Sequence, residues 1–355
     1  MRNYKILFWT VLISVTLIIL YFSTIIVHAI LTDYQPNEIT SLEIAGKAGK
    51  NNVSDSTFTF LSWNIGFAGM GAEMDFFYDG GENVHPSDRL LKKYTSGILN
   101  FIQSADTVDF ILLQEVDRNS TRSNYQDQIS FIQQLMPDYS TSFAINYKVE
   151  YVPLPFFNPV GKVEMGQLNL SKYQPVKSLR RSFYSAYSWP KNLFMLDRCF
   201  IVSYFHLANT KKLVLINTHN SAYDTGGKLR YQEMPVIRDF MLAEYKMGNY
   251  VIAGGDWNQN PPQYNLSEMN SGYHPVKRET LDSFLFPDDW EIAYNPQLPT
   301  NREIDAPFSK EKTGVTIIDY YIVSPNVKIE KVKTVSNEFK FSDHEPVYLK
   351  IRIKD

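Results

Sequence analysis

Residues 251–261 read VIAGGDWNQNP, and the interpretation of the whole chain depends on this stretch. An apolar run typical of a buried strand ends in two glycines, and Asp256 and Asn258 follow two residues apart. Asp, Asn, Gly and Pro all favour turns, so a turn alone explains one strand end of this kind. We expect an active-site edge only if other strands end in the same way.

Other apolar segments do carry acid, amide or imidazole groups at corresponding places. FTFLSWN reaches Asn64, FILLQE ends at Glu115, LVLINTH ends at His219, GVTIIDYYIV contains Asp319, and the loop FSDHEP before the last apolar segment carries Asp343 and His344. A ligand crevice at the edge of a sheet requires polar groups at the ends of core strands. Six such places in one chain favour a functional site over six unrelated turns.

The pattern of the body predicts an α/β fold. Strands are expected at 57–65, 108–117, 162–173, 199–207, 212–219, 250–256, 314–324 and 346–353, and helices at 88–105, 125–136 and 228–246. Ser87 is placed to cap the first of these helices. The helices are too few for a barrel of eight strand–helix units. Two sheets packed face to face, with helices on the outside, fit better.

Composition narrows the chemistry. The chain has 355 residues, 44% hydrophobic and 21% charged, with a net charge of −3. No strongly basic surface follows from this balance, which argues against non-specific nucleic-acid binding through phosphate neutralisation. The single cysteine, Cys199, excludes an internal disulfide and a multi-cysteine zinc site. Oxygen ligands without thiolates favour Mg²⁺, Mn²⁺ or Ca²⁺, and no G-x-S-x-G elbow, P-loop or G-x-G-x-x-G is present.

The N-terminus predicts export. Residues 1–31 carry Arg2 and Lys5 and then an uncharged apolar run from Ile6 to Leu31, long enough to cross a hydrocarbon core of about 30 Å. The positive-inside rule places the N-terminus in the cytoplasm and the body outside. We expect a retained signal anchor; a cleaved signal peptide, giving a secreted protein, is the alternative. Residues 32–56 are interpreted as a juxtamembrane linker and 57–355 as one catalytic domain.

The motifs SWNI, LLQEVD, INTH, GGDWN, IDYYIVS and SDHEP, in this order, resemble those of the endonuclease/exonuclease/phosphatase superfamily, which includes deoxyribonuclease I-like nucleases and neutral sphingomyelinases. The resemblance spans Thr57 to Ile353. It implies a four-layer α/β sandwich and a divalent-metal-dependent hydrolase of phosphate esters. Trp257 stands where the family often has Phe.

The resemblance also implies a role for each matching position. Glu115 would be the main metal ligand, with Asn64 beside it and Asp343 near the metal. Asp256 would deprotonate the attacking water, and Asn258 would hold a phosphate oxygen.

The two histidines and one arginine complete the implied site. His344 would contact the scissile phosphate, with its imidazole held by Asp319. His219 would bind phosphate or assist the leaving group. Arg198 would either reach the phosphate or form a structural salt bridge.

Three segments depart from the motifs. Residues 66–88 form an insert in which Asp75, Asp79 and His85 are candidate extra ligands, although a solvated, turn-rich loop is the favoured interpretation. In HNSAYDTGGKLR, residues 219–230, the glycines and Lys228 are either a phosphate cradle at a helix start or an ordinary helix entry. The aromatic, Pro-rich segment 151–161 either packs on the body or enters a membrane interface.

These observations predict a membrane-anchored, monomeric phosphodiesterase or phosphatase acting on a phospholipid or another small phosphate ester. A metal-dependent nuclease acting on DNA or RNA is the alternative. A catalytically inactive binding module is the remote one, because every central polar group is present.

Overall fold

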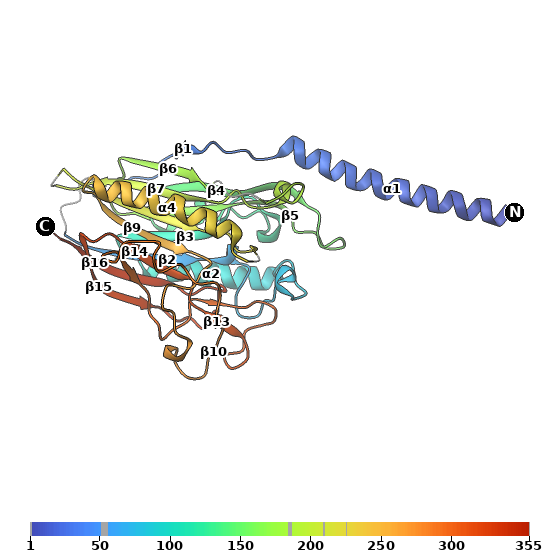
Figure 1. Cartoon of the computed structure of the whole chain (residues 1–355). Coiled ribbons are helices and arrows are strands. Elements are labelled where there is room, and N and C mark those ends of the chain that lie inside the picture. The colour runs from blue at the N-terminus through green and yellow to red at the C-terminus, as the bar shows by residue number, and fades with distance from the viewer. Residues whose placement is uncertain (1, 51–55, 184–186, 209, 225, 355) are drawn as a thin grey trace.

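The computed structural model describes residues 2–50, 56–183, 187–208, 210–224 and 226–354. One long N-terminal helix projects from a compact body in which two large sheets lie face to face (Figure 1). The helices are α1 (Arg2–Thr32), α2 (Asp88–Ser104), α3 (Gln128–Leu135) and α4 (Lys228–Lys246).

One large sheet has seven strands in the order β1-β6-β7-β8-β9-β14-β11. Its strands are β1 (Ile39–Ser41), β6 (Lys177–Ser182), β7 (Cys199–His206), β8 (Lys212–His219), β9 (Tyr250–Asp256), β14 (Asp319–Val323) and β11 (Glu291–Ala293). The other has six strands in the order β15-β16-β2-β3-β5-β4. These are β15 (Val327–Thr334), β16 (Val347–Ile353), β2 (Thr57–Asn64), β3 (Phe110–Asp117), β5 (Gly161–Ser171) and β4 (Ser140–Val152). A small third sheet joins β10 (His274–Pro275), β13 (Gly314–Thr316) and β12 (Asn301–Arg302).

The core lies between the two large sheets, with helices on both outer faces. Phe60 and Phe110 of the six-stranded sheet stack with ring centroids 4.9 Å apart and belong to the same buried cluster as Leu215 and Ile252 of the seven-stranded sheet. The helices α2 and α3 cover the outer face of the six-stranded sheet, and α4 covers that of the seven-stranded sheet. The prediction of a four-layer α/β sandwich is confirmed.

Helix α2 shows how the sequence pattern produces these layers. Ser87 caps it, as predicted, by accepting a hydrogen bond from the amide of Leu90 at 3.4 Å. Its buried residues recur every three or four positions, at Leu91, Tyr94, Ile98 and Ile102. This spacing places them on one helix face, against the sheet.

The prediction of one continuous strand at 314–324 is wrong, because the structure has two strands there. The segment forms β13 in the small sheet and β14 in the seven-stranded sheet, with Ile317 and Ile318 between them. The hydroxyl of Thr300 accepts hydrogen bonds from the amides of Ile318 and Asp319, both at 3.0 Å, so the chain turns where a single strand would have continued. As a result Asp319 begins its strand.

Of the expected linker at 32–56, residues 51–55 lie outside the described part of the chain, and the rest lies partly against the body. Within it, β1 extends the seven-stranded sheet by pairing with β6, and Ala45 forms an isolated bridge with Thr141. Before it, α1 provides one helix, Asn3–Thr32, long and apolar enough to cross a membrane. Chain length and composition alone identify this span, and a signal sequence has the same properties.

Candidate active site

Three adjacent strands of the seven-stranded sheet place polar residues side by side at the same end of the strands. His219 at the end of β8 is in register with Asp256 at the end of the parallel strand β9. Asp256 is in turn in register with Asp319, the first residue of the antiparallel strand β14. The row His219–Asp256–Asp319 therefore follows from strand pairing alone. All three residues are almost completely buried.

The two glycines before Asp256 are required by close packing. A Cβ atom on Gly255, whose φ is +147°, would lie 2.0 Å from the backbone oxygen of Thr218 on the neighbouring strand. A Cβ on Gly254 would lie 2.4 Å from the ring of Tyr321. Glycine lets β9 approach its neighbours closely enough to bring Asp256 into the row.

Asn258 lies in the same cavity as Asp256, but the chain does not stay extended between them. Asn258 adopts a left-handed conformation with φ +52°. Its amide N–H donates to Asp256 Oδ1 at 3.0 Å, and its Nδ2 donates to the backbone oxygen of Asn220 at 3.0 Å. The two side chains share a pocket because a turn brings them there, and not through the alternation of a strand.

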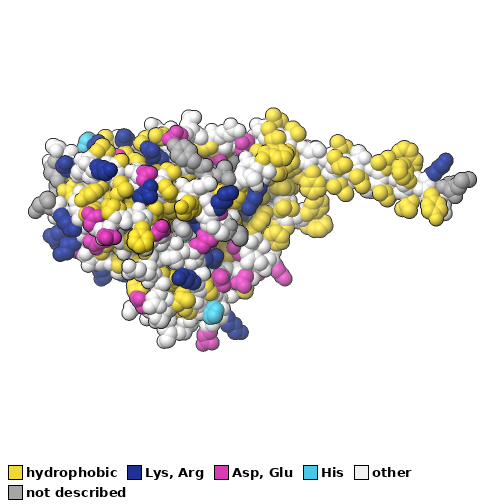
Figure 2. Space-filling view, in the orientation of Figure 1, with side chains coloured by type: hydrophobic (Ala, Val, Ile, Leu, Met, Phe, Trp, Pro, Cys, Tyr) yellow, Lys and Arg dark blue, Asp and Glu magenta, His cyan; other side chains and the backbone are white. Residues whose placement is uncertain are grey.

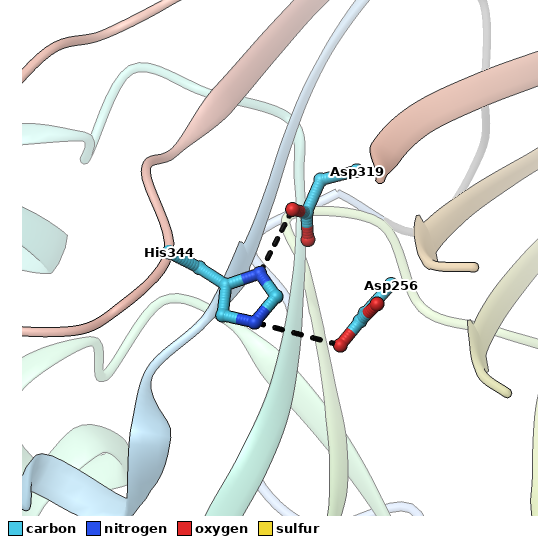
Figure 3. A group of neighbouring side chains, drawn as sticks. All are labelled: Asp256, Asp319 and His344. Carbon is cyan, nitrogen blue, oxygen red and sulfur yellow. Dashed lines mark hydrogen bonds and ion pairs between the residues drawn. The ribbon is translucent and has the colours of Figure 1, made fainter. Parts of the chain in front are cut away.

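His344 lies beside Asp319 and Asp256 (Figure 3). Its Nδ1 lies 2.8 Å from Asp319 Oδ2, and its Nε2 lies 3.7 Å from Asp256 Oδ2 and 3.8 Å from Asp343 Oδ2. Burial alone would lower the pKa of His344, but the charges of Asp319, Asp256 and Asp343 raise this pKa well above its usual value. Asp319 therefore holds the imidazole of His344 in surroundings that favour its protonated form.

Side chains from both large sheets contact Asp256 Oδ2. Asn64, the last residue of β2 in the opposite sheet, donates from Nδ2 to Asp256 Oδ2 at 3.0 Å and to Glu115 Oε1 at 3.2 Å. His219 Nε2 lies 3.4 Å from the same oxygen of Asp256. Burial, with a further contribution from Asp319, raises the pKa of Asp256 to about 6, although His344 and Asn64 oppose the shift.

Glu115 reaches the site because β3 is irregular at this residue. Leu113 pairs with Leu168 and Val116 with Gly166, so Gln114 and Glu115 together oppose one residue of β5. Glu115 itself has φ +53°, which is rare for a residue with a side chain. Strict alternation would place Glu115 with Leu113 beneath the helices. The bulge directs it to the pocket instead and keeps Val116 in the core.

The residues available to a divalent cation are the more accessible carboxylates. The side chain of Glu115 is 24% exposed and that of Asp343 is 14% exposed, and both line the pocket. Burial and the charge of Asp343 raise the pKa of Glu115. These two carboxylates repel one another across the pocket, and a hard cation would offset that repulsion. With Asn64 they form a donor set that fits Mg²⁺, Mn²⁺ or Ca²⁺.

Asp256, Asp319 and His344 offer atoms within 4.8 Å of one another, a spacing that also suits an ion. The short bond between His344 Nδ1 and Asp319 already uses two of these groups. An ion held by this trio would compete with that bond.

His219 and Arg198 lie next to one another in the pocket. Burial, with contributions from Arg198 and His344, lowers the pKa of His219 well below its usual value, so the imidazole is neutral. Arg198 is buried, lines the pocket and donates from Nη1 to the backbone oxygen of His219 at 3.5 Å. Among the described residues its Nε has no hydrogen-bond partner and no carboxylate pairs with it. A buried guanidinium that, among the described residues, bonds only to a backbone oxygen favours an anion-binding role over a structural salt bridge.

Lys228 is not brought into this group. It is the first residue of α4, is exposed and does not line the pocket. The basic residue of that segment that does line it is Arg230, whose Nη2 forms an ion pair with Glu279 at 2.7 Å. The loop before α4 thus matches an ordinary helix entry.

The expectation of a solvated, turn-rich loop holds for residues 77–83 of the insert, which are largely exposed, and is wrong for residues 66–76, which pack against the body. The insert's apolar side chains Phe67, Met70, Met74 and Phe76 are buried. Asp75 accepts hydrogen bonds from Asn83 inside the insert, and His85 Nε2 contacts the backbone oxygen of Pro159 at 3.0 Å. Only Asp79 of its three candidate ligands lines the pocket, where it accepts a hydrogen bond from Tyr223 at 2.9 Å.

Several pocket residues were not identified from the sequence. Asn301, in β12, places its Nδ2 3.1 Å from His344 Nε2. Arg122 lines the pocket and forms a buried ion pair with Asp117 at 2.9 Å. Asn301 follows no apolar strand and Arg122 lies in a short 3-10 turn, so neither carried the signal of a strand end.

Comparisons with known proteins agree with this geometry. The model of the Endonuclease/Exonuclease/phosphatase family matches residues 61–344. No curated protein sequence matches the chain. A protein described as an endonuclease/exonuclease/phosphatase from Beutenbergia cavernae has TM-score 0.55 and 15% identity over 84% of this chain and 72% of that one.

Two further solved structures share the fold. The 2',3'-cyclic phosphatase ANGEL2, in complex with adenosine-2',3'-vanadate, has TM-score 0.55 and 15% identity over 88% of this chain and all of that one, 100%. D. rerio TDP2, in complex with a single-strand DNA product, has TM-score 0.54 and 12% identity over 84% of this chain and 100% of that one.

Proposed function

The chain belongs to the Endonuclease/Exonuclease/phosphatase family, and from this premise we propose that it is a divalent-metal-dependent phosphoesterase acting outside the cytoplasmic membrane. One observation carries the proposal. A single carboxylate oxygen, Asp256 Oδ2, lies among the Asn64 amide, the neutral His219 and the cationic His344, and Asp256 and both histidines line one pocket. A buried base with a cation and amide groups around it suits attack of water on a phosphate ester.

Each group has a role in the hydrolysis. Asp256, whose pKa of about 6 suits a general base near neutral pH, removes a proton from water. The water oxygen forms a bond to phosphorus and the ester P–O bond breaks. The proton removed by Asp256 passes through solvent to the leaving oxygen, which restores the Asp256 carboxylate. His344 and Arg198 stabilise charge on the phosphate oxygens, while Asn258 and His219 orient the phosphate.

Glu115, Asp343 and Asn64 would hold the cation. When bound, a divalent cation neutralises charge on the phosphate oxygens. The bulge that turns Glu115 into the pocket supports this assignment, because it costs regular pairing and leaves the carboxylate facing the pocket.

The substrate proposed is a phospholipid or another small phosphate ester. The apolar helix at the N-terminus supports membrane association, with the body outside. The net charge of −3 gives no support to a polyanionic substrate.

The test is hydrolysis of bis-p-nitrophenyl phosphate by the full chain in detergent, with Mg²⁺ and with EDTA. Asp256→Asn keeps the shape of the side chain and should lower kcat by about 10²- to 10³-fold. The matched control is Asp138→Asn, an exposed residue outside the pocket. Absence of metal-dependent turnover on any phosphate ester would refute the proposal, and exclusive nicking of plasmid DNA would replace the substrate class with nucleic acid.

A further inference from the structure

The pocket that holds the catalytic groups extends to the N-terminal helix. Its volume is about 1050 Å³, which exceeds what a phosphate group requires. Asp256 and His344 line this pocket. It is also lined by four residues of α1, namely Tyr21, Phe22, Ile25 and Ile26, and by apolar residues of the β4–β5 hairpin such as Val152 and Leu154.

Helix α1 changes its surroundings at Tyr21. From Ile6 to Leu20 its large apolar side chains are 42–62% exposed, so this part of the helix has no contact with the body that buries it. From Tyr21 on it packs against the body. The rings of Tyr21 and Phe156 meet edge to face at 5.6 Å, and Ala29 is buried.

The length of the bare part of α1 places the pocket relative to a bilayer. Residues 3–20, all of them exposed, rise about 27 Å at 1.5 Å per residue, close to a hydrocarbon core of about 30 Å. The residues of α1 that line the pocket then lie at the membrane surface, where tyrosine is favoured. Figure 2 shows hydrophobic side chains along α1 and on the body at its base.

The hairpin beside α1 provides a second apolar element at the same level. Leu154 is 50% exposed, Phe156 54% and Phe157 96%. Tyr78 of the insert donates a hydrogen bond to the backbone oxygen of Leu154 at 3.0 Å, which fixes the hairpin against the pocket wall. Three exposed apolar side chains at the base of a membrane-spanning helix form a surface that enters a membrane interface.

We propose that α1 and the β4–β5 hairpin form a hydrocarbon-chain subsite of the active site, and that the substrate is a phospholipid of the adjoining leaflet. This inference rests on the proposed phosphoesterase function. The phosphate lies at Asp256, Arg198 and His344, while the chain lies along Phe22 and Ile25 and passes into the membrane. The anchor is therefore part of the substrate site as well as an attachment.

The test uses methyl, butyl and hexyl esters of p-nitrophenyl phosphate, which share one leaving group and stay monomeric in water. The full chain is placed in lipid nanodiscs. Each methylene fully buried in the subsite should raise kcat/KM by about fourfold. Burial of even two of the roughly five extra methylenes should therefore make kcat/KM of the hexyl ester at least tenfold higher than that of the methyl ester. The variant Phe22→Ser/Ile25→Ser should lose this preference.

The matched control Phe8→Ser/Ile19→Ser makes the same changes on α1 outside the pocket and should keep the preference. Equal kcat/KM for the three esters in the wild-type chain would overturn the subsite and leave the proposed hydrolysis intact. A preference that persists in Phe22→Ser/Ile25→Ser would overturn it as well. Failure to cleave even the methyl ester would refute the proposed function instead.

Discussion

Arg302 is expected to hold the insert 66–88 in place. Its side chain is 1% exposed. Nη2 donates to the backbone oxygens of Met70, Gly71 and Met74 at 3.3, 2.9 and 3.0 Å. Nη1 donates to the backbone oxygens of two residues in its own loop, 303 and 306. One guanidinium thus connects the loop after β12 to the insert that walls the pocket.

The change Arg302→Met removes these donors and keeps the apolar length of the side chain. Each buried carbonyl left without a partner costs about 1–3 kcal/mol, and water can reach some of them after the loop relaxes. We therefore expect the free energy of unfolding to fall by about 3–4 kcal/mol. Arg302→Lys keeps the charge but not the fork of donors, so its loss should be intermediate.

The assay is urea unfolding of the full chain in detergent, followed by the fluorescence of the buried Trp63 and Trp257. Limited proteolysis should cut Arg302→Met inside 66–88 before any other segment. The control Arg352→Met removes only an exposed contact with Glu330 and should change stability far less. An Arg302→Met chain as stable as this control, with an uncut insert, would refute the reasoning.

Three other perturbations test the site and its frame. Mg²⁺ at 100 times its Kd should stabilise the wild-type chain by about 2.7 kcal/mol, which is measured as a higher Tm. Glu115→Gln should lose most of this increase in Tm, and an unchanged increase would show that Glu115 is not a metal ligand. Asp319→Asn removes a negative charge that raises the pKa of His344, so the protonated imidazole should be lost at lower pH, and the alkaline limb of kcat/KM should move to lower pH; an unmoved limb contradicts the pairing. Gly255→Ala places a Cβ 2.0 Å from a backbone oxygen and should lower the free energy of unfolding by about 3 kcal/mol or more. The control Gly226→Ala has open space around its Cβ and is strained only by its φ of +83°, so it should lower the free energy of unfolding by about 1 kcal/mol. Equal losses in urea unfolding would show that the close approach of the strands does not require glycine at 255.

The sequence was sufficient to predict the layers and most of the central polar groups. Apolar strands that end in His219, Asp256 and Asn64 carry a local signal, and strand pairing then brings their ends together. The relation of Asp319 to His344 followed from the family resemblance, and the 2.8 Å contact agrees with it.

Other features depend on contacts between distant segments and were missed for that reason. The bulge at Glu115 arises from pairing with β5, more than forty residues further along the chain. The break before Asp319 depends on the hydroxyl of Thr300 in a loop. The insert was expected to be solvated because it is rich in Gly and Asp, yet Arg302 and buried aromatic residues fold residues 66–76 into the pocket wall.

The attachment of the chain on both sides of residue 33 has a consequence for how the protein meets its substrate. Helix α1 packs against the hairpin from Tyr21, and β1 joins the sheet at Ile39, so only a few residues, 33–38, lie between two fixed points. In a bilayer the body would have little freedom to swing or rotate. For the phospholipid substrate proposed above, encounters would then depend on lateral diffusion within one leaflet, and turnover would vary with the surface density of substrate rather than with its bulk concentration.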